Sequence, residues 1–215
     1  MTKHYEVSLE ISGPTAMWTR PDTGDAPVSY PAPTWSAAKG VFESILWIPG
    51  LEVTPTKVEI CTPLVFHTYT TNYRGPLRKS RLMKQGSSYQ LIATVLINVR
   101  YRLYGKVRSV SAQTRLTDRS RTWTNSTSNP VHAYQEIFNR RVRRGQCYAI
   151  PCLGWKEFVP DYVGTFCEGT EVCQDITLRL PSMLHKVFGS NETCRFSPIY
   201  KQEVEIKRGV LTYVE

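Results

Sequence analysis

Apolar and polar residues alternate at the start of the chain, over residues 4–12, and this pattern predicts a β-strand. A second alternating stretch covers residues 53–66, where a proline interrupts it. Residues 89–105 are rich in β-branched and aromatic side chains, which is typical of a central strand. The first half of the chain therefore supplies several strands of a sheet.

Two other segments carry apolar residues at helical spacing. Residues 35–47 form the first, with Thr34 as the predicted N-cap and a Pro-Gly pair at its end. Its inward stripe consists of Ala38, Val41 and Ile45, with Ala37 and Phe42 beside them. Residues 129–144 form the second helix. Its core-facing residues are predicted to be Ile137, Phe138 and Val142.

The composition of the remaining segments predicts how these elements are joined. Residues 19–34 are rich in Pro, Gly and Asp, which indicates an ordered loop. Residues 67–88 are polar and basic and lie between two strands, so they predict a protruding hairpin, although a surface loop has the same composition. After residue 145 we expect short strands and loops that close in a β-hairpin around Arg208 and Gly209.

The predicted order is strand, helix, strand, basic insertion, strand, helix and then a β-rich end. This order predicts an α+β fold whose first part fits a ferredoxin-like βαββαβ core. A four-stranded sheet of this kind often holds splayed single-stranded RNA bases. The fold alone does not define the function, because unrelated activities share one fold.

Positive charge is concentrated in one third of the chain. The 215 residues carry a formal net charge of +9, but residues 74–144 alone hold 16 Lys or Arg and two acids, Asp118 and Glu136. The rest of the chain is therefore net negative. Charge of one sign over one segment favours a polyanionic partner over a merely soluble basic surface. Phosphate attraction is blind to sequence, so both RNA and duplex DNA fit.

Four of these cations end the second predicted helix, at positions 140, 141, 143 and 144. Neighbouring helical residues point about 100° apart, so Arg140, Arg141, Arg143 and Arg144 do not form one stripe. We expect some of them to bind phosphate. One or two are expected to form ion pairs with Glu136 or Glu157.

Composition and motifs make several other classes of protein unlikely. No apolar run reaches the ~18–20 residues of a membrane span, and residues 1–13 lack an apolar signal core. We therefore expect a cytoplasmic protein with reduced, mostly buried cysteines. The spacing of the cysteines does not favour zinc, and no metal site is predicted. Walker, dinucleotide-binding and serine-elbow motifs are absent from the sequence.

Three stretches resemble one known family: SYPAPTWSAAKGVFESILWIP (29–49), RRVRRGQCYAIPCLGWKEF (140–158) and the ending KRGVLTY. It is the RAMP-type small subunit of CRISPR subtype I-C surveillance complexes, the Cas-five family in its d or c variant. The resemblance covers most of the chain in the expected order. It implies a ferredoxin-like, RRM-like domain over 1–145, with 67–88 as a basic thumb, and a small antiparallel β-sheet domain over 146–215.

The resemblance also implies a function in antiviral defence. In this subtype the family member is an endoribonuclease that cleaves precursor CRISPR repeat RNA and retains the 5′ handle of the guide. It then lies beside the large and backbone subunits of Cascade. The thumb would contact the guide through Arg74, Arg78, Lys79, Arg81 and Lys84. Aromatic candidates for base stacking are Tyr69, Tyr73, Tyr89 and Trp123.

Metal-independent RNA cleavage uses the 2′-OH as nucleophile. It needs a proton acceptor, a proton donor and a cation for the phosphate. The resemblance implies a Tyr near the end of the first helix and a Lys-His pair just before the second. This chain has Leu46 at the Tyr position and Ala133 and Tyr134 at the pair, while His132 lies one residue earlier.

Two interpretations therefore stay open. In the first, the chain is an endoribonuclease with a rearranged site in which His132 and Tyr134 move protons. The cation then comes from Lys39, Arg143 or Arg144. The family pattern requires no cofactor, and a divalent metal is left open. In the second, the chain is a non-catalytic subunit that grips the handle or binds duplex DNA. Subtype I-C systems generally lack a separate processing nuclease, which favours the enzyme.

Overall fold

An antiparallel sheet and three helices make up the part of the chain that the structure describes. The structure is a computed structural model that describes residues 5–73, 89–110, 118–188 and 196–213. The strands are β1 (Glu6–Ala16), β2 (Leu51–Ile60), β3 (Val65–Tyr73), β4 (Tyr89–Ser109), β5 (Tyr162–Gly164), β6 (Leu178–Phe188), β7 (Phe196–Lys207) and β8 (Val210–Thr212). The helices are α1 (Trp35–Ile45), α3 (Asp118–Ser126) and α4 (Pro130–Arg144).

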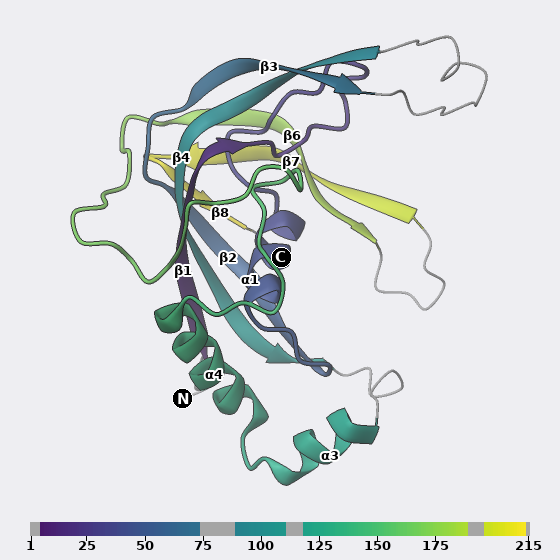
Figure 1. Cartoon of the computed structure of the whole chain (residues 1–215), viewed down its shortest axis with the longest axis vertical. Helices are drawn as coiled ribbons and strands as arrows, with labels where there is room; N and C mark the ends of the chain where they lie inside the picture. Colours follow the sequence, from purple (N-terminus) through teal and green to yellow (C-terminus); the bar gives the residue numbers. More distant parts are fainter. Residues whose placement is uncertain (1–4, 74–88, 111–117, 189–195, 214–215) are drawn as a thin grey trace.

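The strands are hydrogen-bonded in the order β5-β1-β4-β2-β8-β7-β6, and β3 pairs with β4 outside this row (Figure 1). Each of these strand pairs is antiparallel. The predicted mixture of helices with an antiparallel sheet is therefore confirmed. Because β5 and β8 pair with β1 and β2, residues after 145 extend the same sheet. A domain boundary at 145/146 stays a prediction.

The two predicted helices are confirmed, and their ends follow the expected chemistry. The Thr34 hydroxyl accepts a hydrogen bond from the backbone N–H of Ala37 at 3.1 Å, which caps α1. The buried face of α1 is Ala38, Val41, Phe42 and Ile45. Helix α3 was not predicted, because it has no apolar stripe. Of its side chains, only Trp123 is among the half-buried apolar residues that pack against the core.

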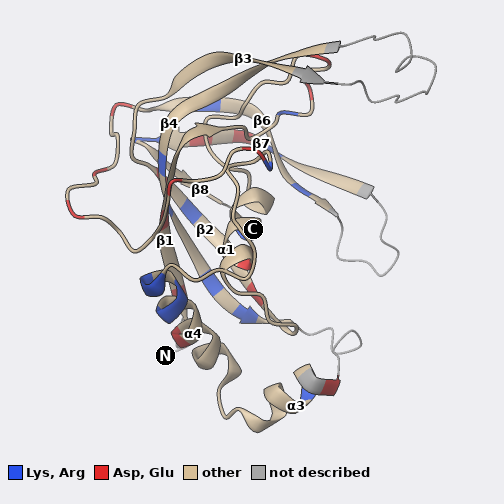
Figure 2. Ribbon diagram, in the orientation of Figure 1, with Lys and Arg blue, Asp and Glu red and all other residues tan. Residues whose placement is uncertain are grey.

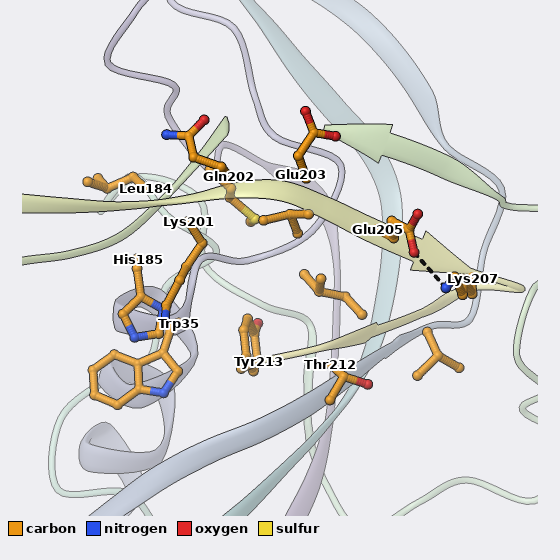
Figure 3. Close-up of a pocket in the computed structure, with 14 residues that line it drawn as sticks. Trp35, Leu184, His185, Lys201, Gln202, Glu203, Glu205, Lys207, Thr212 and Tyr213 are labelled. Atoms are coloured by element: carbon orange, nitrogen blue, oxygen red, sulfur yellow. Dashed lines mark ion pairs between the residues drawn. The ribbon is translucent and has the colours of Figure 1, made fainter. Parts of the chain in front are cut away.

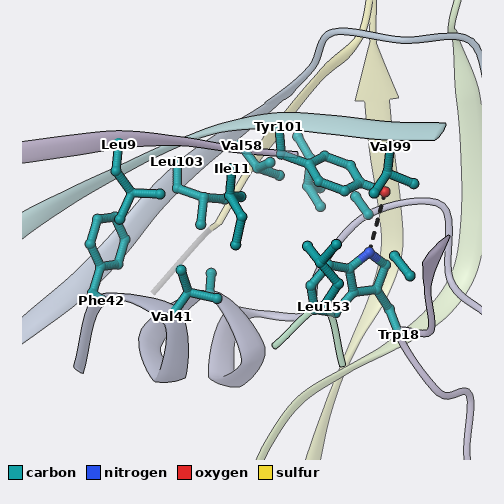
Figure 4. Packing of buried hydrophobic residues seen from close by; sticks show 14 of the residues in the cluster. Leu9, Ile11, Trp18, Val41, Phe42, Val58, Val99, Tyr101, Leu103 and Leu153 are labelled. Atoms are coloured by element: carbon teal, nitrogen blue, oxygen red, sulfur yellow. Dashed lines mark hydrogen bonds between the residues drawn. The ribbon is translucent and has the colours of Figure 1, made fainter. Parts of the chain in front are cut away.

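The hydrophobic core lies between α1 and one face of the sheet (Figure 4). Alternate residues of the strands point toward it, as the two-residue period of a strand requires. Leu9 of β1 and Leu103 of β4 oppose each other in the strand register and are both buried. They meet Phe42 of α1, whose ring is fully buried. The strand pattern thus turns one face of β1 and β4 toward the helix.

The opposite face of β1 and β4 is polar and is covered by residues 165–173. Glu10 has no exposed side-chain area, and its carboxylate pairs with Arg100 at 2.6 Å and with Arg102 at 3.3 Å. The carboxylate also accepts from the backbone N–H of Cys167 at 3.1 Å, and Arg102 donates to the Thr170 carbonyl at 2.7 Å. This part of the polar sheet face is therefore covered by the chain itself and is not open to RNA bases.

Strand β4 is 21 residues long and belongs to two structures at once. Its first half pairs with β3 as a hairpin that projects from the core, from the pair Tyr73–Tyr89 to the pair Val65–Ile97 (Figure 1). Its second half pairs with β1 and β2. Asn98 lies at the junction with a positive φ of 52°. The predicted hairpin is confirmed for the described residues, and it begins before residue 67.

The predicted single strand over 53–66 is wrong in extent. It consists of β2 and the start of β3, with a short connection at 61–64. The interrupting Pro55 marks a shift in register between β2 and β4, because proline cannot donate to the ladder. The predicted C-terminal hairpin is confirmed. Its turn residues Arg208 and Gly209 have φ values of 48° and 76°, as a tight two-residue turn requires.

Candidate nucleic-acid interface

Helix α4 carries the described cluster of arginines, and its ends are fixed by local chemistry. The Asn129 side chain accepts from the backbone N–H of His132 at 3.0 Å, and Pro130 occupies the first turn. Gly145 ends the helix with a left-handed φ of 62°, which glycine adopts without strain. The helix is therefore well defined from the histidine at its start to the arginines at its end.

The arginines have two different roles. Arg141 is half-buried and donates to the carbonyl of Ile45 at 2.7 Å, so it satisfies a free carbonyl at the C-terminal end of α1. Arg140, Arg143 and Arg144 are exposed at the end of α4 (Figure 2). We expected one or two arginines to form ion pairs with Glu136 or Glu157. Arg141 instead donates to a backbone carbonyl.

Tyr134 is buried, so RNA bound at the protein surface cannot contact its hydroxyl. Its side chain is 1% exposed, and its hydroxyl donates to the Leu46 carbonyl at 2.5 Å. Burial, and secondarily the nearby Glu43 carboxylate, raise the pKa of Tyr134 far above its ordinary value. The prediction that Tyr134 moves protons is therefore corrected: it joins α4 to the end of α1. Leu46 is also buried, so two of the altered family positions form one internal contact.

His132 is the candidate that the structure leaves accessible. Its side chain is 53% exposed, its ring centroid lies 5.8 Å from that of Tyr5, and its Nε2 lies 3.9 Å from Glu136. Glu136, Asn139 and Arg143 follow it at helical spacing. They line a cavity of about 380 Å³ together with Ser8, Val142, Thr165 and Phe166. The exposed stripe of α4 thus combines an imidazole, a carboxylate, an amide and a guanidinium.

The cation predicted beside His132 is not placed as expected. Arg143 and Arg144 follow His132 by eleven and twelve residues, which is about 16 to 18 Å along a helix, so neither lies beside the imidazole. Lys39 pairs with Glu52 at 2.6 Å and lies 3.9 Å from Glu43, which leaves its ammonium neutralised within the protein. None of the three predicted cations, Lys39, Arg143 and Arg144, therefore lies where a site centred on His132 would need it.

The cationic thumb residues Arg74, Arg78, Lys79, Arg81 and Lys84 lie outside the described residues. Tyr69, at the base of the hairpin, packs edge-on against Phe158 with ring centroids 5.3 Å apart. Trp123 is half-buried against the core. Both aromatic candidates therefore have packing roles, while the side chains of Tyr73 and Tyr89 lie outside the part of the chain that the structure describes.

Tyr5 and Asn139 were missed by the sequence analysis. The Tyr5 hydroxyl accepts from Asn129 Nδ2 at 2.6 Å, which places its ring beside His132. Asn139 had a readable signal, because it follows His132 by seven residues and therefore shares its side of a helix. Tyr5 had none, since its contact spans more than 120 residues of sequence.

The described cysteines form no disulfide and no metal-binding group. The cysteines at 61, 147, 152, 167 and 173 are free, as expected, but Cys147 is exposed and the others are half-buried, so "mostly buried" is wrong. Within the described ranges, no three His, Cys, Asp or Glu side chains are grouped to hold a metal ion. Over the same ranges, no helix has the length and apolarity that crossing a bilayer would require.

A larger cavity, of about 600 Å³, lies between α1 and the strands β6, β7 and β8 (Figure 3). Trp35 stacks on His185 at its wall, with ring centroids 4.9 Å apart. Burial, and then the charges of Lys201 and Lys186, lower the pKa of His185. Glu205 and Lys207 at the same cavity pair with each other at 2.6 Å. This cavity gathers none of the predicted catalytic residues.

The fold and this surface together define a mixed α/β protein with an arginine-rich helical face of the kind that binds nucleic-acid phosphates. A family model described as CRISPR-associated protein (Cas_Cas5), in its Cas5d form, matches residues 7–172. The chain therefore belongs to the Cas5 family of CRISPR-associated proteins, and the resemblance seen in the sequence is confirmed.

Two curated relatives carry the name "CRISPR pre-crRNA endoribonuclease Cas5d". The one from Mannheimia succiniciproducens is 30% identical over 167 residues, which is 71% of this chain and 69% of the relative. The one from Thermus thermophilus is 26% identical over 155 residues, which is 71% of this chain and 61% of the relative. The chain thus spans less than two thirds of the second relative.

Two solved structures share the fold. A crystal structure of a CRISPR-associated protein has a TM-score of 0.69 at 18% identity, over 98% of this chain and 92% of that one. A functionally uncharacterized protein from Streptococcus mutans has a TM-score of 0.68 at 17% identity, with the same coverage. At these identities the likeness concerns the fold.

Proposed function

We propose that this protein is an endoribonuclease that cleaves precursor CRISPR repeat RNA and then holds the 5′ handle of the guide as a subunit of a subtype I-C Cascade. The observation that carries the proposal is its 30% identity to a relative named as a pre-crRNA endoribonuclease. The exposed arginines at the end of α4 support it, because they offer phosphate contacts on a defined helix.

His132 is the proposed proton acceptor. It takes the proton of the 2′-OH, and the 2′-oxygen attacks the adjacent phosphorus. The bond to the 5′-oxygen breaks, and that oxygen takes a proton from a donor that is not yet assigned. The products are a 2′,3′-cyclic phosphate and a free 5′-OH. No metal or cofactor is needed for these steps, and the proposal includes none.

The test is cleavage of end-labelled repeat RNA by the purified protein, with and without EDTA. We expect one cut that resists EDTA and falls at least a hundredfold in rate in His132→Ala, as for loss of a general base. His132→Gln keeps a polar side chain but cannot titrate, so it should fail equally. A cut that EDTA abolishes would contradict the His132 mechanism. A cut unchanged in both variants would do the same.

A second function is favoured by the internal contact between Leu46 and Tyr134. At these two family positions the chain has a buried apolar side chain and a buried phenol, and at the third it has Ala133. A subunit that binds the handle without cutting fits this arrangement. The assay distinguishes it: RNA binding without any cut, and cutting gained in Ala133→Lys, would establish this second function.

The finer features of the fold and partners belong to the same proposal. The strand order β5-β1-β4-β2, with helices α1 and α4 between consecutive strands, supports a ferredoxin-like core. The proposed partners are CRISPR RNA through α4 and the thumb, and the large and backbone subunits of Cascade. Duplex DNA is a competitor for the same phosphate contacts. Competition between repeat RNA and duplex DNA at two salt concentrations separates the two partners.

A further inference from the structure

Trp47 and Tyr148 form an exposed aromatic pair beside the end of α4. All five tryptophans lie in the described residues, and Trp47 is the exposed one, with 51% of its surface accessible. Tyr148 is 67% exposed, and the two ring centroids are 6.4 Å apart at an interplanar angle of 34°. A large apolar ring left in water on a soluble protein indicates a binding surface when it lies in a patch.

The backbone under this pair is held in place, so the rings are presented on a fixed support. The backbone N–H groups of Tyr148 and Ala149 donate to the Ser44 carbonyl at 2.8 and 2.9 Å. The N–H of Gln146 donates to the Arg141 carbonyl at 2.9 Å. Trp47 lies two residues after the end of α1, and Tyr148 lies four residues after the end of α4. A preformed support lowers the ordering cost of binding.

Arg141 brings positive charge near the pair, because its guanidinium donates to the carbonyl of Ile45, two residues before Trp47. A cavity of about 210 Å³ lies between the ends of α1 and α4 and includes Ile45, Arg141 and Ile150. Arg141 is the charged residue in its wall, which contains no carboxylate. Arg144 precedes Tyr148 by four residues, which is at most about 14 Å of backbone, so one RNA strand can reach both side chains. Aromatic faces next to guanidinium groups are typical of single-strand binding.

We propose that Trp47 and Tyr148 stack on a base of single-stranded CRISPR RNA while the arginines at the end of α4 hold its phosphates. This inference rests on the proposed function and adds the residues that position the strand. Every base has a flat face, so the contact tolerates different sequences at this point. Trp47 and Tyr148 are positioning residues, since neither has to take part in proton transfer.

The test measures the Kd of end-labelled single-stranded repeat RNA for the full chain and its variants. We expect Trp47→Ala and Tyr148→Ala each to weaken binding about five- to hundredfold, as for loss of one stacked base. Trp47→Phe keeps an aromatic face and should retain most of the affinity. Tyr200→Ala removes an exposed aromatic ring on β7 and is the matched control. Because all these rings are exposed, unchanged thermal melting is the check on folding.

RNAs that each lack one base identify the contact directly. At one position, removal of the base should weaken binding to the wild-type protein but add nothing to the loss in Trp47→Ala, because the stacking partner is already absent. If wild-type protein binds RNA and both alanine variants bind equally well, the inference is overturned. A second result would also overturn the inference. If Ile150→Ala and Trp47→Ala both failed to bind a Cascade subunit but kept their affinity for RNA, the patch would be a protein contact. If wild-type protein binds no RNA, the proposed function itself fails.

Discussion

The hydroxyl of Tyr134 and the carbonyl of Leu46 join the first turns of α4 to the end of α1. A tyrosine beside a histidine is a reasonable acid–base pair in sequence, yet burial gives this one a structural role. The signal was present in the sequence: Tyr134, Phe138 and Val142 lie four residues apart and form one apolar stripe. The carbonyl partner was not readable, since it lies 88 residues away.

Tyr134→Phe tests this role. We expect the variant to unfold more easily by about 1–3 kcal/mol, because the buried carbonyl of Leu46 loses its donor. Thermal denaturation measures the change, and RNA cleavage at a temperature where both proteins are folded should be unaltered. Tyr200→Phe, which removes an exposed hydroxyl, should leave stability unchanged. Cleavage lost with stability retained would return Tyr134 to the catalytic site.

At the scale of the element, periodicity predicted α1, α4 and the start of β4, because each has a clear apolar pattern. It did not predict α3, whose sequence DRSRTWTNS is polar on all sides. The sequence pattern also placed all four arginines on α4, but it did not show which of them is bound within the protein and which are exposed. Only the position of the α1 C-terminus separates the half-buried Arg141 from its exposed neighbours.

The exposed arginines make a prediction at this scale. Arg143→Glu and Arg144→Glu should each weaken RNA binding and lower the slope of log K against log salt by about 0.7 per lost phosphate contact. Arg208→Glu, in the turn between β7 and β8, makes the same charge change elsewhere and is the control. Binding measured between low and moderate salt gives both quantities. Equal slopes in all four proteins would remove Arg143 and Arg144 from the interface.

At the scale of the whole molecule, the two faces of the sheet have different functions. One face packs on α1, and the other holds residues 165–173 through the Glu10, Arg100 and Arg102 network. The alternation of apolar and charged residues along β1 and β4 indicated two different faces. It did not show that a segment more than 150 residues later covers the charged one, because that depends on the path of the chain after β5.

The Glu10 network predicts a pH dependence of stability. Burial alone would raise the pKa of Glu10, but bonds from the Cys167 N–H and from Arg100 and Arg102 outweigh it and lower the pKa below 4.5. The unfolded chain therefore binds the proton at a higher pH than the folded chain. The stabilisation is complete above about pH 4.5 and is lost as the pH falls through the lower folded pKa.

Glu10→Gln should remove most of this acid dependence and lower stability at neutral pH by about 2 kcal/mol, since Arg100 and Arg102 keep partial access to water. For a chain of this size that corresponds to roughly 4–8 °C in Tm. Denaturation curves from pH 3 to pH 7 measure both effects. Glu171→Gln changes an exposed carboxylate nearby and is the matched control. If wild type and Glu10→Gln lost the same stability between pH 7 and pH 3, Glu10 would be excluded as the cause of the acid dependence.

The length of β4 has a consequence for how this protein can vary. One continuous strand forms part of both the projecting hairpin and the centre of the sheet. The side chains alternate between the two faces along this strand, so the facing of one half depends on the number of residues that separate it from the other half. Adding one residue to β4 near Asn98 would turn every side chain of one half to the opposite face relative to the other. Insertions in this strand are therefore expected in even numbers, or paired with a compensating bulge. The reach of the hairpin can then change during evolution while the packing of the core against α1 stays the same.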